Sequence, residues 1–362
     1  MSVNDVSEPS STPTRGAAAI AHTTREQVLE RALRDWRGEL EGRVAVITGA
    51  ARGIGQVMAE WLMHAGANVV AVDKTWDDAD AHRQNVLDAH GLAIRADITS
   101  DTDVNDAYEK VIESYGRADI LINNAALVSE TLYPPMGHRP TLETTDQDWA
   151  AMFAVNVFGT VRITRRFIKP MIEQGSGSIV NVVSSGLLAE SSGGAYYGAR
   201  PYTVEMPYQA TKAALAAFAF YLAEEVRGDG VAVNSLMPGH TRASWFDDTA
   251  RAYDQAGLVY FLRPVVSEHI VPITLFLSAQ DSRHVTGRLF HVPDWNYDHG
   301  YGNYAFWQDH NLPAQVEKMY AQMEAATPPF ERSGLPQPAF DTQVGLFVAA
   351  MANMARTDGA AS

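Results

Sequence analysis

Short runs rich in valine and isoleucine alternate with longer stretches of helical spacing between residues 42 and 292. In the longer stretches apolar residues recur every three or four positions, as at Val57, Trp61 and Ala65. Such alternation is typical of a parallel sheet covered by helices on both faces. We therefore expect one doubly wound α/β domain over residues 42–292, whose mainly parallel sheet has seven strands: Val44–Thr48, Asn68–Val72, Leu92–Asp97, Ile120–Asn123, Ser178–Val183, Val231–Leu236 and Leu289–Val292.

Two extensions flank this domain. Residues 1–22 are rich in Ser, Thr, Pro and Ala, which predicts a flexible tail, and residues 23–41 carry apolar positions at helical spacing behind a possible capping box at Thr23 and Thr24. Residues 293–362 show helical patterns near Val316–Met323 and Val344–Met354. Six aromatic residues lie within thirteen positions at their start: Trp295, Tyr297, Tyr301, Tyr304, Phe306 and Trp307. Two hypotheses stay open for this extension, a lid over a substrate pocket or a strap to its own domain or another subunit.

Composition excludes several classes of partner and chemistry. The formal charge of −15 argues against nucleic acid or an anionic membrane as the main partner. With no cysteine there is no disulfide, thiolate nucleophile or zinc-thiolate site, and no tight His/Asp cluster predicts another metal site. No secretory signal is evident, and the apolar runs fall short of the roughly 20 residues of a membrane span. We expect a cytoplasmic protein without a metal.

The first strand leads straight into a glycine-rich turn and a helix, through residues Thr48-Gly49-Ala50-Ala51-Arg52-Gly53-Ile54-Gly55. Such a turn presents backbone amides and a helix N-terminus to a pyrophosphate, although tight strand-to-helix turns also need glycine for backbone reasons alone. Asp73 ends the second strand about twenty residues later, where a carboxylate accepts hydrogen bonds from ribose hydroxyls and repels a 2′-phosphate. The pattern favours NAD over NADP.

Further motifs resemble the short-chain dehydrogenase/reductase family over about 250 residues. The glycine turn is similar to that family's glycine motif, and Asp97-Ile98 to its adenine-flanking pair. The remaining matches follow in the family's order: Asn123-Asn124-Ala125-Ala126, Asn156, Ser184-Ser185, Tyr208-Gln209-Ala210-Thr211-Lys212 and Pro238-Gly239. The resemblance implies a Rossmann-type fold and a cofactor site that includes Gly49, Arg52, Gly53, Ile54, Gly55, Asp73, Asp97, Ile98, Asn124, Ala125, Tyr208, Lys212, Pro238, Gly239 and Thr241.

The same resemblance implies hydride transfer between the cofactor and an alcohol/ketone pair, with Tyr208 as the acid/base. A free tyrosine titrates near ~10, and an ammonium one helical turn away, as at Lys212, favours the phenolate and lowers that pKa. By analogy with the family, Lys212 also holds the nicotinamide ribose. Ser185 would bind the substrate oxygen, and Asn156 would order a water that leads to Lys212. We expect a cyclic or otherwise apolar secondary alcohol as substrate.

Two departures from the family's pattern concern the substrate side. Tyr196 and Tyr197 lie closer to the usual distance from the serine pair, but Pro201 and Arg200 stand where the lysine is required. Tyr208 lies 23 residues after Ser185, so about ten extra residues are expected beside the pocket. Ala243 replaces a common threonine after Pro238-Gly239, and we assign its hydrogen bond to Thr241, with Ser244 as an alternative. His240 is given no catalytic role.

Alternatives remain at this stage. Within the fold, a redox-neutral lyase or epimerase would retain bound NAD, and from another class a nucleotide-binding regulator would have lost catalysis. The intact Ser185, Tyr208 and Lys212 argue against the regulator. The helix expected at residues 209–226 is apolar nearly all round, and the pattern repeats near Trp149–Val161. Both predict helix faces that pack on a partner subunit, in a homodimer or homotetramer.

Overall fold

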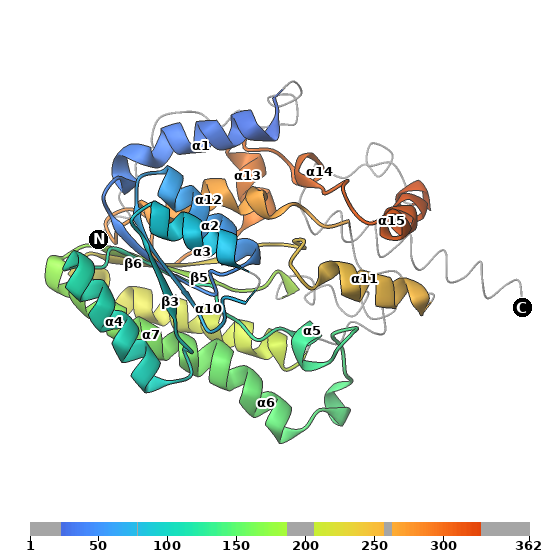
Figure 1. The fold of residues 1–362 in the computed structure, drawn as a ribbon, viewed down its shortest axis with the longest axis horizontal. Coiled ribbons are helices and arrows are strands. Elements are labelled where there is room, and N and C mark those ends of the chain that lie inside the picture. The colour runs from blue at the N-terminus through green and yellow to red at the C-terminus, as the bar shows by residue number, and fades with distance from the viewer. Residues whose placement is uncertain (1–22, 78, 187–205, 257–262, 327–362) are drawn as a thin grey trace, which may run out of the picture.

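The computed structural model describes residues 23–77, 79–186, 206–256 and 263–326. Its centre is a seven-stranded sheet with the strand order β3-β2-β1-β4-β5-β6-β7, in which all neighbouring strands run parallel (Figure 1). The strands are β1 (Val44–Thr48), β2 (Asn68–Asp73), β3 (Leu92–Arg95), β4 (Ile120–Asn123), β5 (Gly177–Val182), β6 (Val231–Met237) and β7 (Leu289–His291). The expected Rossmann-type sheet of seven strands is therefore confirmed.

Strand bounds differ from the expectation by one or two residues at β2, β3, β5, β6 and β7, and the early ends of β3 and β7 have local reasons. β3 is an edge strand, and β2 is its single neighbour in the sheet. β3 therefore ends at Arg95, which pairs with Asp73, the last residue of β2. β7 stops at His291, because Val292 already begins the helix α13 (Val292–Asp298), which has a proline in its first turn. Proline is favoured there because the first turn of a helix needs no backbone amide from it.

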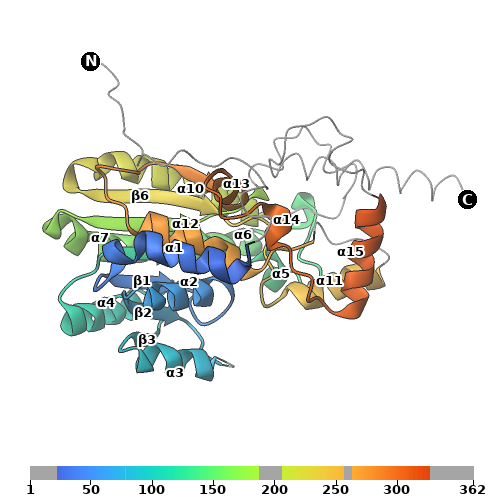
Figure 2. The same ribbon diagram turned by 90° about the horizontal axis from the view of Figure 1, so that it is seen from above.

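Helices cover both faces of the sheet, because successive strand residues point to opposite faces. Ala45 and Ile47 pack in one apolar cluster, and Val44 and Val46 in another. The first cluster lies under α1 (Arg25–Leu40), α2 (Gly53–His64) and α12 (Val271–Ser278), and the second under α4 (Asp101–Tyr115), α7 (Thr160–Gln174) and α10 (Tyr208–Glu225) (Figures 1 and 2). Shorter elements complete the main domain: α3 (Asp80–Asp88), α5 (Ser129–Leu132), α6 (Asp146–Phe153), α11 (Phe246–Gln255) and the 3-10 turns η2 (Thr141–Glu143), η5 (Arg227–Asp229) and η6 (Ser267–Ile270).

The helix expected around Trp149–Val161 is not continuous in its geometry. α6 leads into a π-helix, η3 (Ala154–Gly159), which continues directly into α7. A π-helical turn carries an extra residue and occurs mostly at functional sites. This one contains Asn156 and delivers its side chain to the interior, where it is fully buried.

The two extensions pack against each other. Thr24 caps α1 in a capping box with Gln27. The C-terminal extension adds α13, α14 (Tyr304–Trp307) and α15 (Ala314–Ala326), and it buries Trp295, Tyr301, Tyr304 and Trp307 in the cluster that includes α1 and α12. The Val344–Met354 pattern lies outside the described residues. Among the described ones, no helix is both long and apolar enough to cross a lipid bilayer.

Candidate active site

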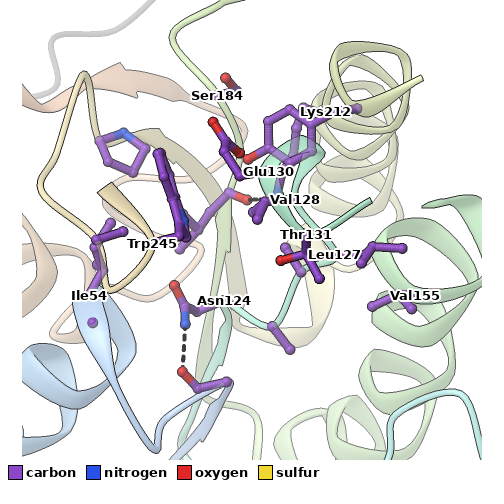
Figure 3. A pocket seen from close by; sticks show the side chains of 18 of the residues that line it. Ile54, Asn124, Leu127, Val128, Glu130, Thr131, Val155, Ser184, Lys212 and Trp245 are labelled. Atoms are coloured by element: carbon purple, nitrogen blue, oxygen red, sulfur yellow. Dashed lines mark hydrogen bonds between the residues drawn. The ribbon is translucent and has the colours of Figure 1, made fainter. Parts of the chain in front are cut away.

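A cavity of about 640 Å³ opens where the parallel strands end at their carboxyl edge (Figure 3). Ligands bind at this edge in open α/β sheets, and the volume lies in the range of ligand pockets. Its wall combines the glycine turn after β1 and the segments that follow β2, β3, β4, β5 and β6 with the start of α10. Of the expected site residues, Gly55 and Asn156 are absent from the lining and lie behind it.

The glycine turn is built so that no side chain fits at two of its positions. A Cβ on Gly55 would lie 2.0 Å from the Gly49 carbonyl oxygen and 2.5 Å from Nδ2 of Asn124, and one on Gly49 would lie 2.8 Å from Cα of Ala125. Asn124 holds the turn, because its Nδ2 donates to the carbonyls of Thr48 (3.1 Å) and Gly49 (2.9 Å). These contacts fix the glycine turn against the segment after β4. α2 begins directly after the turn, and Gly53 and Ile54 in its first turn line the cavity.

Two carboxylates stand at the ends of the neighbouring strands. Asp73 accepts hydrogen bonds from the backbone amides of Ala51 (3.0 Å) and Thr75 (3.2 Å), which fix it beside the glycine turn. Asp97 accepts from the amide of Thr99 at 2.8 Å. Both line the cavity together with Arg52 and Ile98. The arrangement places two carboxylates, which can accept hydrogen bonds from hydroxyl groups, at one end of the cavity.

Asn156 joins three parts of the site from behind the wall. Its Oδ1 accepts from the Leu127 amide at 2.7 Å, and its Nδ2 donates to the Leu127 carbonyl at 3.0 Å and to Oγ1 of Thr211 at 2.9 Å. The side chain therefore fixes the segment after β4 against α10. Sequence reasoning placed Asn156 in the site but missed these structural contacts.

Tyr208 begins α10 and lines the cavity, with Lys212 one turn further along the helix. Lys212 is 2% exposed, its Nζ lies 5.5 Å from the centre of the Tyr208 ring, and it donates to the Val182 carbonyl at 2.8 Å. Burial lowers the pKa of Lys212 to about 8. A group with this pKa is mostly protonated at neutral pH and close to the point at which it releases its proton.

Both members of the serine pair line the cavity after β5. Oγ of Ser184 accepts from Nε2 of Gln209 (3.1 Å) and from the Gly186 amide (3.2 Å), so Ser184 holds the loop to α10. This occupation of Ser184 is consistent with Ser185 as the residue that meets substrate. Tyr196 and Tyr197, weighed against Tyr208 above, lie outside the described residues.

The segment after β6 forms the wall beside these groups. Gly239, at φ +82°, passes so close to the C-terminal extension that an added Cβ would lie 3.2 Å from Cγ of Pro293. Behind it, Nε2 of the buried His269 lies 2.5 Å from the Pro238 carbonyl. Thr241, His240 and Ser244 all line the cavity. The wall thus offers both hydroxyls named for the carboxamide contact.

The substrate side contains residues that no sequence motif indicated. Leu127, Val128 and Val155 give it apolar surface, Trp245 projects into it from across the cavity, and polar groups come from Thr131 and Glu130 (Figure 3). Glu130 is close to Gly137, where an added Cβ would lie 2.8 Å from Cγ of the glutamate. A charged residue among apolar ones cannot be recognised as a site residue from spacing alone.

Residues 43–254, more than half of the chain, match the model of the short chain dehydrogenase family. The chain belongs to this family. The resemblance noted in the sequence is thereby confirmed, and the protein is an oxidoreductase that interconverts an alcohol and a ketone.

Individual relatives of this short chain dehydrogenase extend the comparison. The chain is 59% identical over 340 residues to the fluoren-9-ol dehydrogenase of Terrabacter sp. strain DBF63, covering 94% of this chain and 95% of that one. It is 32% identical to a 3-oxoacyl-(acyl-carrier-protein) reductase of Thermotoga maritima, covering 70% and 97%. A 3-ketoacyl-(acyl-carrier-protein) reductase of Brucella melitensis, solved with NADH, matches with a TM-score of 0.57 and 27% identity, covering 70% and 97%. The match to the Terrabacter enzyme therefore includes most of the two extensions. The matches to the two reductases cover 97% of those chains but only 70% of this one.

Proposed function

We propose that this chain is an NAD-dependent dehydrogenase that interconverts a rigid, apolar secondary alcohol such as fluoren-9-ol and its ketone. The observation that carries the proposal is the placement of Tyr208 at the cavity with buried Lys212 one turn behind it. The apolar residues Leu127, Val128 and Trp245 around them suit a planar ring system, and the Terrabacter relative acts on fluoren-9-ol.

The cofactor site supports a dinucleotide. Gly49 and Gly55 lie so close to neighbouring backbone atoms that neither position can carry a Cβ. The tight turn that results directs the N-terminus of α2 toward the place where a pyrophosphate would bind. Asp73 stands beside this turn and would repel a 2′-phosphate, which favours NAD. A nicotinamide bound at this site would supply the hydride acceptor for oxidation and the hydride donor for reduction.

The chain's own residues handle the proton. Tyr208 takes the proton of the alcohol hydroxyl during oxidation and returns it during reduction. Lys212, when protonated, favours the phenolate of Tyr208 by charge attraction. Ser185 donates to the substrate oxygen and holds it near the Tyr208 hydroxyl. In this proposal Asn156 keeps Leu127 and α10 in register, so that the pocket and the acid/base helix do not shift against each other.

A substrate screen tests the proposal. Fluoren-9-ol, other cyclic alcohols, steroid alcohols and linear alcohols are offered with NAD and NADP in parallel, and the reduced cofactor is followed by absorbance. We expect the polycyclic alcohol with NAD to react best. Cofactor binding without net reduction of the cofactor by any alcohol would favour a redox-neutral enzyme or a nucleotide-binding regulator, and loss of both cofactor binding and turnover would refute the proposal.

We further propose that the protein forms a homodimer or homotetramer through the helices α10 and η3. Large apolar side chains are exposed on these neighbouring elements: Phe158 at 59%, Phe220 at 39% and Tyr221 at 76%. Light scattering at micromolar concentration tests this, and a monomer would contradict it. Because the chain lacks cysteine, we also infer that it works in the reducing cytoplasm.

A further inference from the structure

The cavity wall after β6 has one residue that faces elsewhere. In the rim segment, defined as residues 238–245, seven residues line the cavity: Pro238, Gly239, His240, Thr241, Ala243, Ser244 and Trp245. Arg242 is the exception, and its side chain reaches the C-terminal extension instead. A charged residue in the middle of a pocket wall therefore serves a contact on the outer side of that wall.

The contacts of Arg242 are numerous and specific. Its Nε and Nη2 donate to the two carboxylate oxygens of Asp247 at 3.1 and 2.8 Å, a paired geometry that fixes the guanidinium plane. Its Nη1 donates to Oδ2 of Asp309 at 3.0 Å and to the Asn311 carbonyl at 3.0 Å. The side chain of Asp309 is only 9% exposed, so this ion pair is shielded from solvent more than an ordinary surface pair.

Backbone hydrogen bonds run through the same place. The Val265 amide donates to the His240 carbonyl at 2.9 Å, and the Arg242 amide donates to the Val265 carbonyl at 3.0 Å. On the other side of this middle segment, the Val266 amide donates to the Trp307 carbonyl at 2.9 Å, and the Asp309 amide to the Pro264 carbonyl at 2.8 Å. The rim segment is thus one of three adjoining segments, and the outermost belongs to the extension.

Apolar packing continues the connection beyond Arg242. α11, which follows the rim segment, packs on α15 of the extension, and Figures 1 and 2 both place these two helices together at one end of the molecule. Phe246 and Tyr253 from α11 share a buried cluster with Val316 and Tyr320 from α15. The extension therefore supports the rim segment from outside the cavity, and none of its described residues, 293–326, is among those that line the cavity.

We propose that Arg242 is a positioning residue that ties the rim segment to Asp309 of the C-terminal extension and thereby sets the affinity for the alcohol substrate. This inference rests on the proposed function, because it takes Ala243 and Trp245 as the part of the wall against which the substrate lies. The nicotinamide end of the segment is held separately, by His269 behind Pro238 and by Pro293 beside Gly239. Loss of Arg242 should therefore disturb substrate binding more than cofactor binding.

Steady-state kinetics provide the first test. Arg242→Met keeps the approximate length of the side chain and removes its four hydrogen bonds to Asp247, Asp309 and Asn311, while the backbone hydrogen bond to Val265 remains. We expect the KM for the alcohol to rise about tenfold, because a displaced wall makes poorer contact with the substrate, with kcat and the Kd for NADH within about twofold of the parent. Arg242→Lys should fall between parent and Arg242→Met, because an ammonium cannot serve both carboxylates with a planar fork.

The partner and the control make the test specific. Asp309→Asn should raise KM less than Arg242→Met, and combining the two should add less than the sum of their separate effects, since they remove one shared contact. Arg227→Met is the matched control, because Arg227 forms an ion pair with Glu224 at the far end of α10 and is not among the described residues that line the cavity. Its KM should equal that of the parent.

Hydrogen exchange provides a readout that needs no substrate. In Arg242→Met, peptides covering residues 238–253 should exchange faster, whereas β1 and β4 and the whole Arg227→Met control should not change. Unchanged exchange in the rim segment would overturn the inference, whether or not an alcohol substrate is found. Absence of turnover with every alcohol would refute the proposed function, and the exchange measurement distinguishes the two failures. A parallel fall of kcat, NADH affinity and global stability would also overturn it, since that pattern indicates a structural defect.

Discussion

The two halves of the cleft are built by different means. The half assigned to the cofactor is held by main-chain atoms and short polar side chains, as where Asn124 bonds the Gly49 carbonyl and Asp73 accepts from the Ala51 amide. The half assigned to the substrate depends on side chains from distant segments, such as Trp245 before α11 and Arg242 paired with Asp309. The first half leaves little freedom for its sequence, whereas the second can change while the sheet stays the same.

Tyr208→Phe tests the proposed acid/base role of Tyr208, which lies between the cofactor half and the substrate half of the cleft. The substitution removes the hydroxyl that exchanges a proton with substrate and leaves the helix and Lys212 in place. Turnover should fall by at least the ~10²–10⁴ typical of general acid/base catalysis, with NADH affinity nearly intact. Tyr115→Phe on α4, away from the cavity lining and from the proposed subunit interface, is the control and should be normal. Near-normal turnover in Tyr208→Phe would refute the mechanism and bring Tyr196 and Tyr197 back into consideration.

Lys212→Met examines the buried charge beside the cofactor half through stability. In the folded protein the pKa of Lys212 is lowered to about 8 by burial, whereas the unfolded chain keeps its ordinary value of 10.5. Between these values the unfolded chain binds one more proton, so the stability contributed by this group rises with pH. The free energy of unfolding of the parent relative to Lys212→Met should increase by up to about 3 kcal/mol from below pH 8 to near pH 10.5.

Urea unfolding of both proteins at the two pH values measures this difference. Lys169→Met, at an exposed position on α7, is the control and should show no such change. A difference that stays constant with pH would mean that Lys212 keeps its proton in the folded state.

Gly55→Ala tests whether the cofactor half tolerates any side chain. The added Cβ would lie 2.0 Å from a backbone oxygen, so the turn has to move. Overpacking of this kind costs about 1–3 kcal/mol, which predicts roughly tenfold to 100-fold weaker NADH binding by titration. Gly38→Ala on α1 is the matched control, because nothing lies within 4 Å of the added atom. Equal NADH affinity in both variants would show that the turn is not as rigid as described.

Asp73→Ser measures the smallest of the expected effects. Removal of one carboxylate beside the glycine turn should shift the ratio of NADPH to NADH affinity by about tenfold toward NADPH. Asp77→Ser, an exposed carboxylate that does not line the cavity, should leave the ratio unchanged. If the parent already uses both cofactors equally, the role given to Asp73 is wrong.

The difference between the halves also explains what could be predicted from the sequence. The sheet can be predicted because short apolar runs alternate with stretches of helical spacing. The glycine turn can be predicted because the contact between Gly55 and Asn124 leaves no space for a side chain at position 55. The π-helical turn around Asn156 could not be predicted, because one extra residue in a single turn hardly changes the spacing of apolar residues along the chain. The Arg242–Asp309 contact joins residues 67 positions apart and belongs to no motif.

The aromatic residues after β7 illustrate the same limit. Aromatic content indicates that a segment will bury surface but does not say against what, so lid and strap were equally open hypotheses. The burial of Trp295, Tyr304 and Trp307 with α1 and α12 supports a strap for this part of the extension. The packing of α15 on α11 adds a link to the pocket rim that neither hypothesis contained.

The contact between α1 and the C-terminal extension has a consequence for the order in which the chain can fold during synthesis. Arg25 at the start of α1 donates to the Phe306 and Gln308 carbonyls, and Tyr301 donates to Asp35 on the same helix. At about 5–20 residues per second, a ribosome needs roughly 15–60 s to make the intervening chain. The apolar face of α1 therefore stays incompletely covered until residues 295–308 have been synthesised. Loss of α1 would uncover the aromatic residues of the extension, and loss of the extension would uncover part of α1, so damage to either terminus should expose one side of the same interface and promote aggregation.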